Sequence, residues 1–158
     1  MAGKNVKNLA KSMGLNIFAG AAKVMAKEKG HAMSLKGKTA VITGSNSGIG
    51  LGVARELARS GADVVLNSFT DRPEDHALAK SLADEFGVTA RYIRADMSKG
   101  ADCRALIEQA GRCDILVNNA GIQHVAPIDE FPVDKWDAII AINLSSAFHT
   151  TAAALPMM

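Results

Sequence analysis

The sequence predicts an α/β fold in which a doubly wound parallel sheet carries helices on both faces. From Lys38 onward, short apolar runs alternate with patterns of helical periodicity. A glycine-rich turn, Thr43–Gly50, joins the first apolar run to a helical pattern, and a second turn signal, Asn118–Gly121, follows the fourth run. Repeated strand and helix in this order require right-handed crossovers and a parallel sheet. The chain ends at Met158, so we expect the sheet to be truncated after its fourth strand and the following helix.

The four expected strands are short apolar runs, as strands that helices bury on both faces should be. The first leads directly into the glycine-rich turn. Each of the other three follows a glycine (Gly61, Gly87 or Gly111) that is placed to end a helix. The expected strands span Thr39–Thr43, Asp63–Asn67, Val88–Arg94 and Asp114–Val117.

Apolar residues at helical spacing define one face of each expected helix. In the first helix this face is Ile49, Val53 and Leu57, and we expect it to pack on the sheet. The second helix follows Pro73, and the third begins near Ser98, a candidate N-cap. The apolar residues of the second helix are Leu78, Leu82 and Phe86, and those of the last helix, which starts near Val133, are Trp136, Ile139, Ile140, Leu144 and Phe148.

The composition is that of a globular domain. A chain of 158 residues buries roughly two-thirds of the surface that it exposes when unfolded, and its aliphatic content argues against disorder. Cys103 and Cys113 lack metal-ligand spacing, so we expect reduced structural thiols, a cytoplasmic protein and no bound metal. No apolar run approaches the ~20 residues of a membrane span. With a net charge of +2, we expect neither a membrane span nor a nucleic-acid partner.

The uneven charge marks a boundary near residues 30–34. Residues 1–30 carry six lysines against Glu28, a charge of +5, which leaves −3 on the rest of a chain whose total is +2. We therefore predict a basic extension, residues 1–33, that is weakly helical or disordered, before a nucleotide-binding domain, residues 34–158. The extension contains no arginine and its apolar runs are interrupted, which disfavours a mitochondrial or secretory address. An unpacked tail, an early start site and a membrane-surface helix remain as interpretations.

Each glycine of the first motif has a physical reason. Gly44 allows a sharp turn out of the strand, Gly48 brings the backbone close to a pyrophosphate, and Gly50 lets the helix pack tightly on the strand. The free N–H groups at the helix N-terminus then favour phosphate charge. Leu51 follows Gly50 where a P-loop needs lysine, so this motif is not a P-loop.

The two motifs together resemble those of the short-chain dehydrogenase/reductase family, in the expected order and over residues 35–158. The resemblance implies a Rossmann-type fold and an oxidoreductase that uses a nicotinamide cofactor. Residues 114–156, including Gln123–Ile128 and Ile142–His149, resemble the members that pass hydride between NAD and a short 3-hydroxy acid such as 3-hydroxybutyrate. An NADPH-dependent 3-oxoacyl or acetoacetyl reductase is the alternative activity, and a non-catalytic nucleotide-binding fragment is the alternative class.

The resemblance also implies roles for single residues. The pyrophosphate and the nicotinamide ribose would contact the motif residues between the glycines, the adenine would contact the end of the third strand, and the adenosine ribose would contact the second motif. The resemblance makes Gln123 a contact for a substrate carboxylate, to which its amide can donate. The implied cofactor residues, with the three glycines, are Asn46, Ser47, Ile49, Phe69, Asp96, Met97, Asn118, Ala120 and Gly121.

Asn143 is unusual even without the resemblance, because its spacing from Ile139 and Ile140 places it on the apolar face of the last helix. A buried amide without partners costs roughly 1–3 kcal/mol. One interpretation is a tie from the helix to nearby backbone. The resemblance implies the other, a catalytic asparagine that holds the water of a proton relay.

The choice of cofactor is partly readable from the end of the second strand. Members that prefer NAD usually carry an acid there to bind the ribose hydroxyls, and Ser68 followed by Phe69 stands at that place. Members that prefer NADP usually carry a basic residue near Phe69 or at Ser47, and neither position is basic. We therefore expect NAD, and Arg72 is the residue that would reverse this choice.

The family's hydride chemistry uses a tyrosine, a lysine four residues later and a serine, all of which follow the asparagine helix. The single tyrosine of this chain, Tyr92, lies upstream and has Asp96 four residues later. We therefore expect a cofactor-binding portion that lacks the Ser/Tyr/Lys residues and is inactive alone. The resemblance implies that the intact enzyme acts on a small hydroxy or keto acid and assembles as a homo-oligomer.

Overall fold

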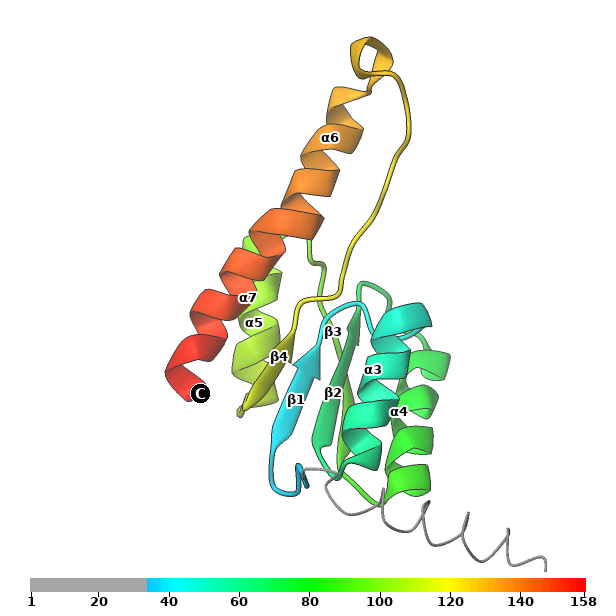
Figure 1. Ribbon diagram of the computed structural model, residues 1–158, viewed down its shortest axis with the longest axis vertical. Coiled ribbons are helices and arrows are strands. Elements are labelled where there is room, and N and C mark those ends of the chain that lie inside the picture. The colour runs from blue at the N-terminus through cyan, green and yellow to red at the C-terminus, as the bar shows by residue number, and fades with distance from the viewer. Residues whose placement is uncertain (1–33) are drawn as a thin grey trace, which may run out of the picture. The chain divides into compact units, whose positions relative to one another are not determined.

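The computed structural model describes residues 34–158, which form one compact unit. The expectations for residues 1–33 lie outside the described residues. The sheet has four parallel strands in the order β3-β2-β1-β4 (Figure 1). This arrangement confirms the predicted α/β fold with a parallel sheet. The strands are β1 (Thr39–Ile42), β2 (Asp63–Ser68), β3 (Ala90–Arg94) and β4 (Ile115–Val117).

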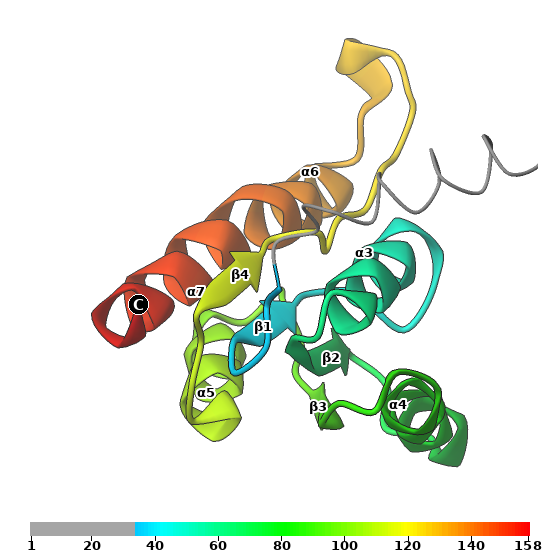
Figure 2. The ribbon, with the colours of Figure 1, turned by 60° about the horizontal axis from the view of Figure 1, so that its bottom comes forward.

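Helices cover both faces of this sheet (Figures 1 and 2). On one face lie α3 (Gly48–Arg59) and α4 (Pro73–Phe86), and on the other lie α5 (Gly100–Ala110) and α7 (Ser146–Ala154). The two faces have separate apolar cores, one around Leu66 and Leu82 and the other around Leu106 and Ile107. Cys103 and Cys113 are buried in the second core as free thiols.

The predicted packing face of α3 is wrong by one position. Ile49 is 81% exposed, whereas Gly50, Ala54 and Ala58 are buried. The apolar side chains of Val53 and Leu57 are only partly buried. Small residues face the sheet because the helix axis must come close to the strands where the glycine-rich turn enters it.

The ends of α4 and α5 follow the sequence signals more closely. Gly87 and Gly111 end these helices in the left-handed region, with φ of 67° and 72°, which glycine adopts without a steric penalty. Pro73 begins α4, as expected. Ser98, however, is not the N-cap of α5, because Lys99 occupies that position and Ser98 instead donates to the Asp96 carboxylate.

The segment after β4 extends beyond the sheet and returns along α5 (Figure 1). Its helix is continuous but not uniform, because a π-helical stretch separates α6 from α7. By length and composition alone, the helix spanning Val133–Met157 could cross a membrane, with a mean hydropathy of 1.4. The segment consists of η2 (Ile128–Glu130), α6 (Val133–Ile139), η3 (Ile140–Ser145), α7 and η4 (Leu155–Met157).

Candidate cofactor-binding site

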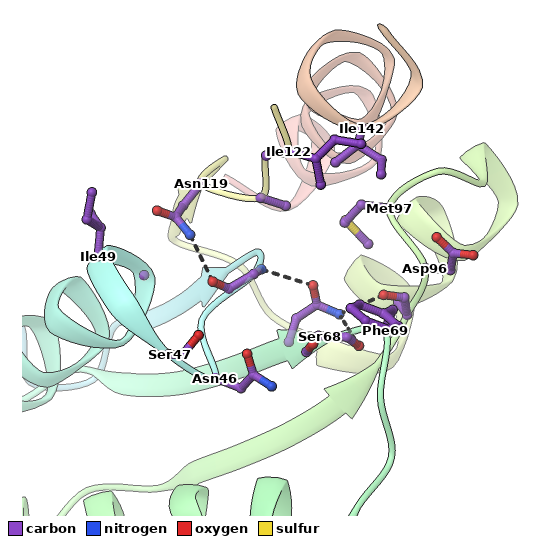
Figure 3. Close-up of a pocket in the computed structure, with 16 residues that line it drawn as sticks. Asn46, Ser47, Ile49, Ser68, Phe69, Asp96, Met97, Asn119, Ile122 and Ile142 are labelled. Carbon is purple, nitrogen blue, oxygen red and sulfur yellow. Dashed lines mark hydrogen bonds between the residues drawn. The ribbon is translucent and has the colours of Figure 1, made fainter. Parts of the chain in front are cut away.

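A cavity of about 310 Å³ lies beyond the carboxyl ends of the strands (Figure 3). In the sheet order, β1 has β2 on one side and β4 on the other, and the crevice at such a reversal is where open α/β sheets bind ligands. All the predicted cofactor-binding residues line this cavity except Gly48 and Asn118. Those that line it are Gly44, Asn46, Ser47, Ile49, Gly50, Phe69, Asp96, Met97, Ala120 and Gly121.

The glycine-rich turn forms a cradle in which side chains do not fit. A Cβ at Gly44 would lie 2.9 Å from the Cα of Ala120, and a Cβ at Gly50 would lie 2.5 Å from the carbonyl oxygen of Gly44. Gly48 has open space around it but a φ of +56°, so its requirement is conformational rather than steric. This cradle therefore suits a group that needs close contact with backbone.

The first turn of α3 forms one wall of the cavity, through Ser47, Ile49 and Gly50. The N–H groups of a first helical turn have no partner inside the helix, and this turn contains no acidic residue. The Ser47 hydroxyl makes no capping hydrogen bond within the described residues. An anion such as a pyrophosphate therefore fits this end of the cavity.

Hydrogen bonds join the two glycine motifs directly. The Thr43 hydroxyl accepts from the backbone N–H groups of Asn119 and Ala120, each at 3.0 Å. The Asn119 amide donates to the carbonyl oxygens of Thr43 and Gly44, each at 2.9 Å. Asn119 was not among the predicted site residues, although its neighbours were. The second motif therefore holds the first in shape as well as lining the cavity.

Asn67 is a second site residue that the two motifs do not indicate. Its side chain is fully buried at the end of β2, where its amide oxygen accepts from the Gly44 N–H at 3.2 Å. The amide nitrogen donates to the carbonyl oxygens of Ser68, Ile93 and Ala95. A polar residue ending the apolar run Val64–Leu66 was the available signal.

At the other end of the cavity, Phe69 is 70% exposed and lies near Asp96 and Met97. The Asp96 carboxylate accepts from the N–H and hydroxyl of Ser98 and pairs with Lys99 at 3.4 Å. These contacts, led by the Ser98 hydroxyl, lower the pKa of Asp96. Within residues 34–158, no basic side chain lines the cavity.

The predicted Asn118 contact with the ribose is not supported by its side-chain position. The Asn118 amide oxygen accepts from the Thr150 hydroxyl at 2.6 Å, and its nitrogen donates to Thr151 at 3.2 Å. This side chain therefore connects the end of β4 to α7.

Asn143 lies in the π-helical stretch and is exposed, so its expected burial is wrong. Its amide both accepts from the N–H and donates to the carbonyl of Ile122, each at 2.9 Å. This is the tie from helix to backbone that the sequence allowed. It positions Ile122, which lines the cavity together with Ile142, and neither residue was predicted. Gln123, next in the chain, is exposed and does not line the cavity.

Tyr92 is not available for proton transfer at this site. It is 8% exposed in the core beneath α4, and its hydroxyl donates to the carbonyl oxygen of Thr70. Burial is the main cause of its raised pKa. Within residues 34–158, no group of three or more His, Cys, Asp or Glu side chains could hold a metal ion.

Residues 38–158 match the sequence profile described as short chain dehydrogenase. The chain belongs to this family. Among curated short-chain dehydrogenases, it is 55% identical over 128 residues to the D-beta-hydroxybutyrate dehydrogenase of Cupriavidus necator, and 50% identical over 125 residues to the enzyme of the same name from Rhizobium meliloti. These matches cover 78% and 77% of the chain but 49% and 48% of the relatives. The chain thus spans about half the length of the curated relatives that it matches.

Solved structures share this fold. A blue fluorescent protein from a metagenomic library, in complex with NADPH, superposes with a TM-score of 0.76 at 36% identity, covering 80% of this chain and 53% of that one. An NADH-dependent reductase, A1-R′, responsible for alginate metabolism, gives a TM-score of 0.71 at 37% identity, covering 78% and 52%. The likeness therefore supports a nicotinamide cofactor but does not choose between its two forms.

Proposed function

We propose that this chain is the NAD-binding portion of a dehydrogenase of the 3-hydroxybutyrate type. The intact enzyme would oxidise 3-hydroxybutyrate to acetoacetate while NAD⁺ takes up the hydride, giving NADH and a proton. The observation that carries the proposal is the cradle of Gly44, Gly48 and Gly50 at the N-terminus of α3, within a chain 55% identical to a D-beta-hydroxybutyrate dehydrogenase.

Each part of the cavity has a proposed task. The first turn of α3, with Asn46, Ser47 and Ile49 beside it, would bind the pyrophosphate and the nicotinamide ribose. Asp96 and Met97 would contact the adenine. The backbone around Ala120 and Gly121, more than the side chain of Asn118, would lie under the adenosine ribose. Phe69 would pack against the adenosine.

The substrate side of the site has its own proposed residues. Gln123 would contact the substrate carboxylate. The side chain of Asn143 would hold Ile122 in place, and the Asn143 carbonyl would hold the water of a proton relay.

The site favours NAD because the cavity wall formed by Ser47, Ser68 and Phe69 carries no positive charge for a 2′-phosphate. An NADPH-dependent 3-oxoacyl or acetoacetyl reductase is the second candidate. It is favoured by the solved relative that was crystallised with NADPH. For the intact enzyme we also propose a cytoplasmic setting and a homo-oligomer.

Titration calorimetry with NAD⁺ tests the binding site. We expect weak binding to the wild-type chain and at least a tenfold loss in Gly48→Val, because valine resists the φ of +56° that this turn requires. Gly52→Ala is the matched control, since Gly52 also lies in α3 with open space around it and no positive φ. Equal affinities in folded wild-type and Gly48→Val proteins would refute the phosphate-loop assignment.

We also expect no dehydrogenase turnover from this chain alone. Its single tyrosine is in the core, and the loss of acid–base groups removes several orders of magnitude in rate. The measurement is NADH formation from D-3-hydroxybutyrate at high protein concentration. Rates of about 1–10³ s⁻¹, as in ordinary enzymes, would contradict this expectation.

A further inference from the structure

The carboxylate of Asp75, in the first turn of α4, is unusually well bonded. The residue is 2% exposed. Its Oδ1 accepts from the Asn46 amide at 3.0 Å and from a terminal nitrogen of Arg72 at 3.1 Å. Its Oδ2 accepts from the Thr70 hydroxyl at 2.7 Å and from the backbone N–H and Nε of Arg72 at 3.1 and 3.2 Å. Asp75 thus holds the Arg72 guanidinium by two of its nitrogens.

This ion pair lies beside the candidate cofactor site. Asn46 and Phe69 line the cavity, and Thr70 and Arg72 belong to the segment that leads from Phe69 into α4. Because the Asn46 amide and the Arg72 terminal nitrogen share one oxygen of Asp75, they lie within two hydrogen-bond lengths of each other. The guanidinium is therefore close enough to the cavity wall to contact a ligand phosphate after a change of rotamer.

In the observed arrangement, the positive charge of Arg72 is not offered to the cavity. Its charge is balanced at close range by Asp75, and its bidentate fork is already engaged, which is the strongest form of guanidinium–carboxylate contact. A 2′-phosphate approaching this wall would meet a neutral pair. Moving Arg72 toward it would leave a buried carboxylate less well compensated, which is unfavourable.

We propose that Asp75 is a positioning residue for cofactor selectivity: by holding Arg72, it withholds a positive charge from the ribose end of the cavity and favours NAD over NADP. The inference rests on the proposed function and adds the residue that sets its choice of nucleotide. Asp75 acts through Arg72 and touches no part of the nucleotide itself.

Four proteins test the inference: wild type, Arg72→Gln, Asp75→Asn and the double variant. Dissociation constants for NAD⁺ and NADP⁺ are measured by calorimetry after thermal melts show that each protein is folded. The double variant removes both charges of the pair, so its NADP⁺ affinity should stay within about twofold of wild type, because the Arg72 side chain, which is 58% exposed, makes no phosphate contact there. Arg72→Gln alone leaves Asp75 without its cation, so it should bind NADP⁺ no better than wild type. In Asp75→Asn, the preference for NAD⁺ should fall at least tenfold, and the double variant should restore it.

The double variant separates selectivity from a purely structural role. Loss of a helix cap alone would weaken the binding of NAD⁺ and NADP⁺ equally, and this weakening would not depend on Arg72. Arg94→Gln is a further control, because Arg94 donates to the carbonyl oxygen of Phe69 but makes no contact with Asp75 among the described residues. This variant should not alter the effect of Asp75→Asn.

Two results would overturn the inference. One is an unchanged NAD⁺/NADP⁺ ratio in folded Asp75→Asn that still binds NAD⁺, and this result leaves the proposed function intact. The other is a tenfold loss of NADP⁺ affinity in the double variant relative to wild type, which would mean that Arg72 already serves a 2′-phosphate. Failure of folded wild type to bind either nucleotide refutes the proposed function, and this inference with it.

NMR of the Arg72 side chain adds a readout that needs no nucleotide. The Arg72 Nε–H should exchange with water more slowly in wild type than in Asp75→Asn. Equal exchange rates would show that Asp75 does not hold the guanidinium.

Discussion

Buried and partly buried amide and carboxylate side chains shape this site more than exposed ones do. Asn67 connects the glycine-rich turn to β3, and Asn119 connects the same turn to the end of β4. Each has several hydrogen bonds to backbone, and each such bond typically contributes about 1 kcal/mol net. Both residues also line the cavity. Their main effect is to fix the backbone of Gly44.

At the residue scale, we predict an acid-sensitive contribution of Asp75 to stability. Its hydrogen bonds, first that from Arg72, hold the pKa of its carboxyl far below the ordinary value. A carboxyl whose pKa is lower when folded contributes stability that is fully present above its unfolded pKa, about 3.9, and is lost as pH falls below that value. The stability difference between wild type and Asp75→Asn should therefore be constant from about pH 7 to 5 and shrink below about pH 4. Urea unfolding at each pH provides the measurement, and a difference that persists unchanged at about pH 3 would contradict it.

At the scale of elements, the sequence predicted the four strands and their helices because apolar runs, proline and glycine report local structure directly. It missed the packing face of α3, since Ile49 and Gly50 have the same helical periodicity and only the close approach to the sheet selects the smaller residue. It missed the N-cap of α5 because the N–H and hydroxyl of Ser98 both donate to the Asp96 carboxylate, which holds Ser98 in a turn, and the helix begins one residue later, after Lys99.

The candidate site was predictable to a similar extent. The motifs indicated most of the cavity-lining residues, because the backbone requirement for glycine is visible in sequence. Asn67, Ile122 and Ile142 were not visible, since they reach the cavity through strand pairing and through a π-helical stretch. A π-turn shifts the helical register by one residue, which also explains why Asn143 is exposed rather than buried.

The tie between Asn143 and Ile122 gives a prediction about this π-helical element. Asn143→Ala removes two hydrogen bonds at an exposed position, worth about 1 kcal/mol together. The Ile122 N–H should then exchange with solvent roughly fivefold faster, and NAD⁺ affinity should fall because Ile122 lines the cavity. Hydrogen exchange followed by NMR measures this, with Ser81→Ala on the exposed face of α4 as the control. An unchanged exchange rate of the Ile122 N–H would show that the Asn143 side chain does not hold the segment around Ile122.

At the scale of the whole molecule, two apolar surfaces stand out. Within residues 34–158, β4 pairs only with β1, so its outer edge has no strand partner. Along the helix after β4, Trp136, Leu144 and Phe148 are 52%, 64% and 69% exposed. Unpaired edges and contiguous apolar surfaces promote association. Charged groups that would oppose it, Arg112 and Asp114, lie at one end of β4 and bond to each other.

We therefore predict concentration-dependent self-association of this chain. Sedimentation velocity across a wide concentration range should show it, and adding the C-terminal half of a related dehydrogenase should relieve it. The variant Leu144→Glu/Phe148→Glu should associate less without losing stability, because both side chains are already exposed. Glu85→Gln, on the opposite face of the sheet, is the matched control. A compact monomer at high concentration would show that the chain covers these surfaces itself.

The bonds from Thr43 to Asn119 and Ala120 also bear on how the protein is made. A ribosome releases Thr43 long before it releases the residues that this hydroxyl must bind, because 76 positions separate Thr43 from Asn119. Strands β1 to β3 can pair as they emerge, since synthesis proceeds at about 5–20 residues per second and their partners are already present. The nucleotide cradle is different: it takes its final shape only after β4 has been translated. During synthesis, therefore, the residues that complete the cradle follow most of the core beneath α3 and α4, but precede Ala154, which completes the core beneath α5 and α7.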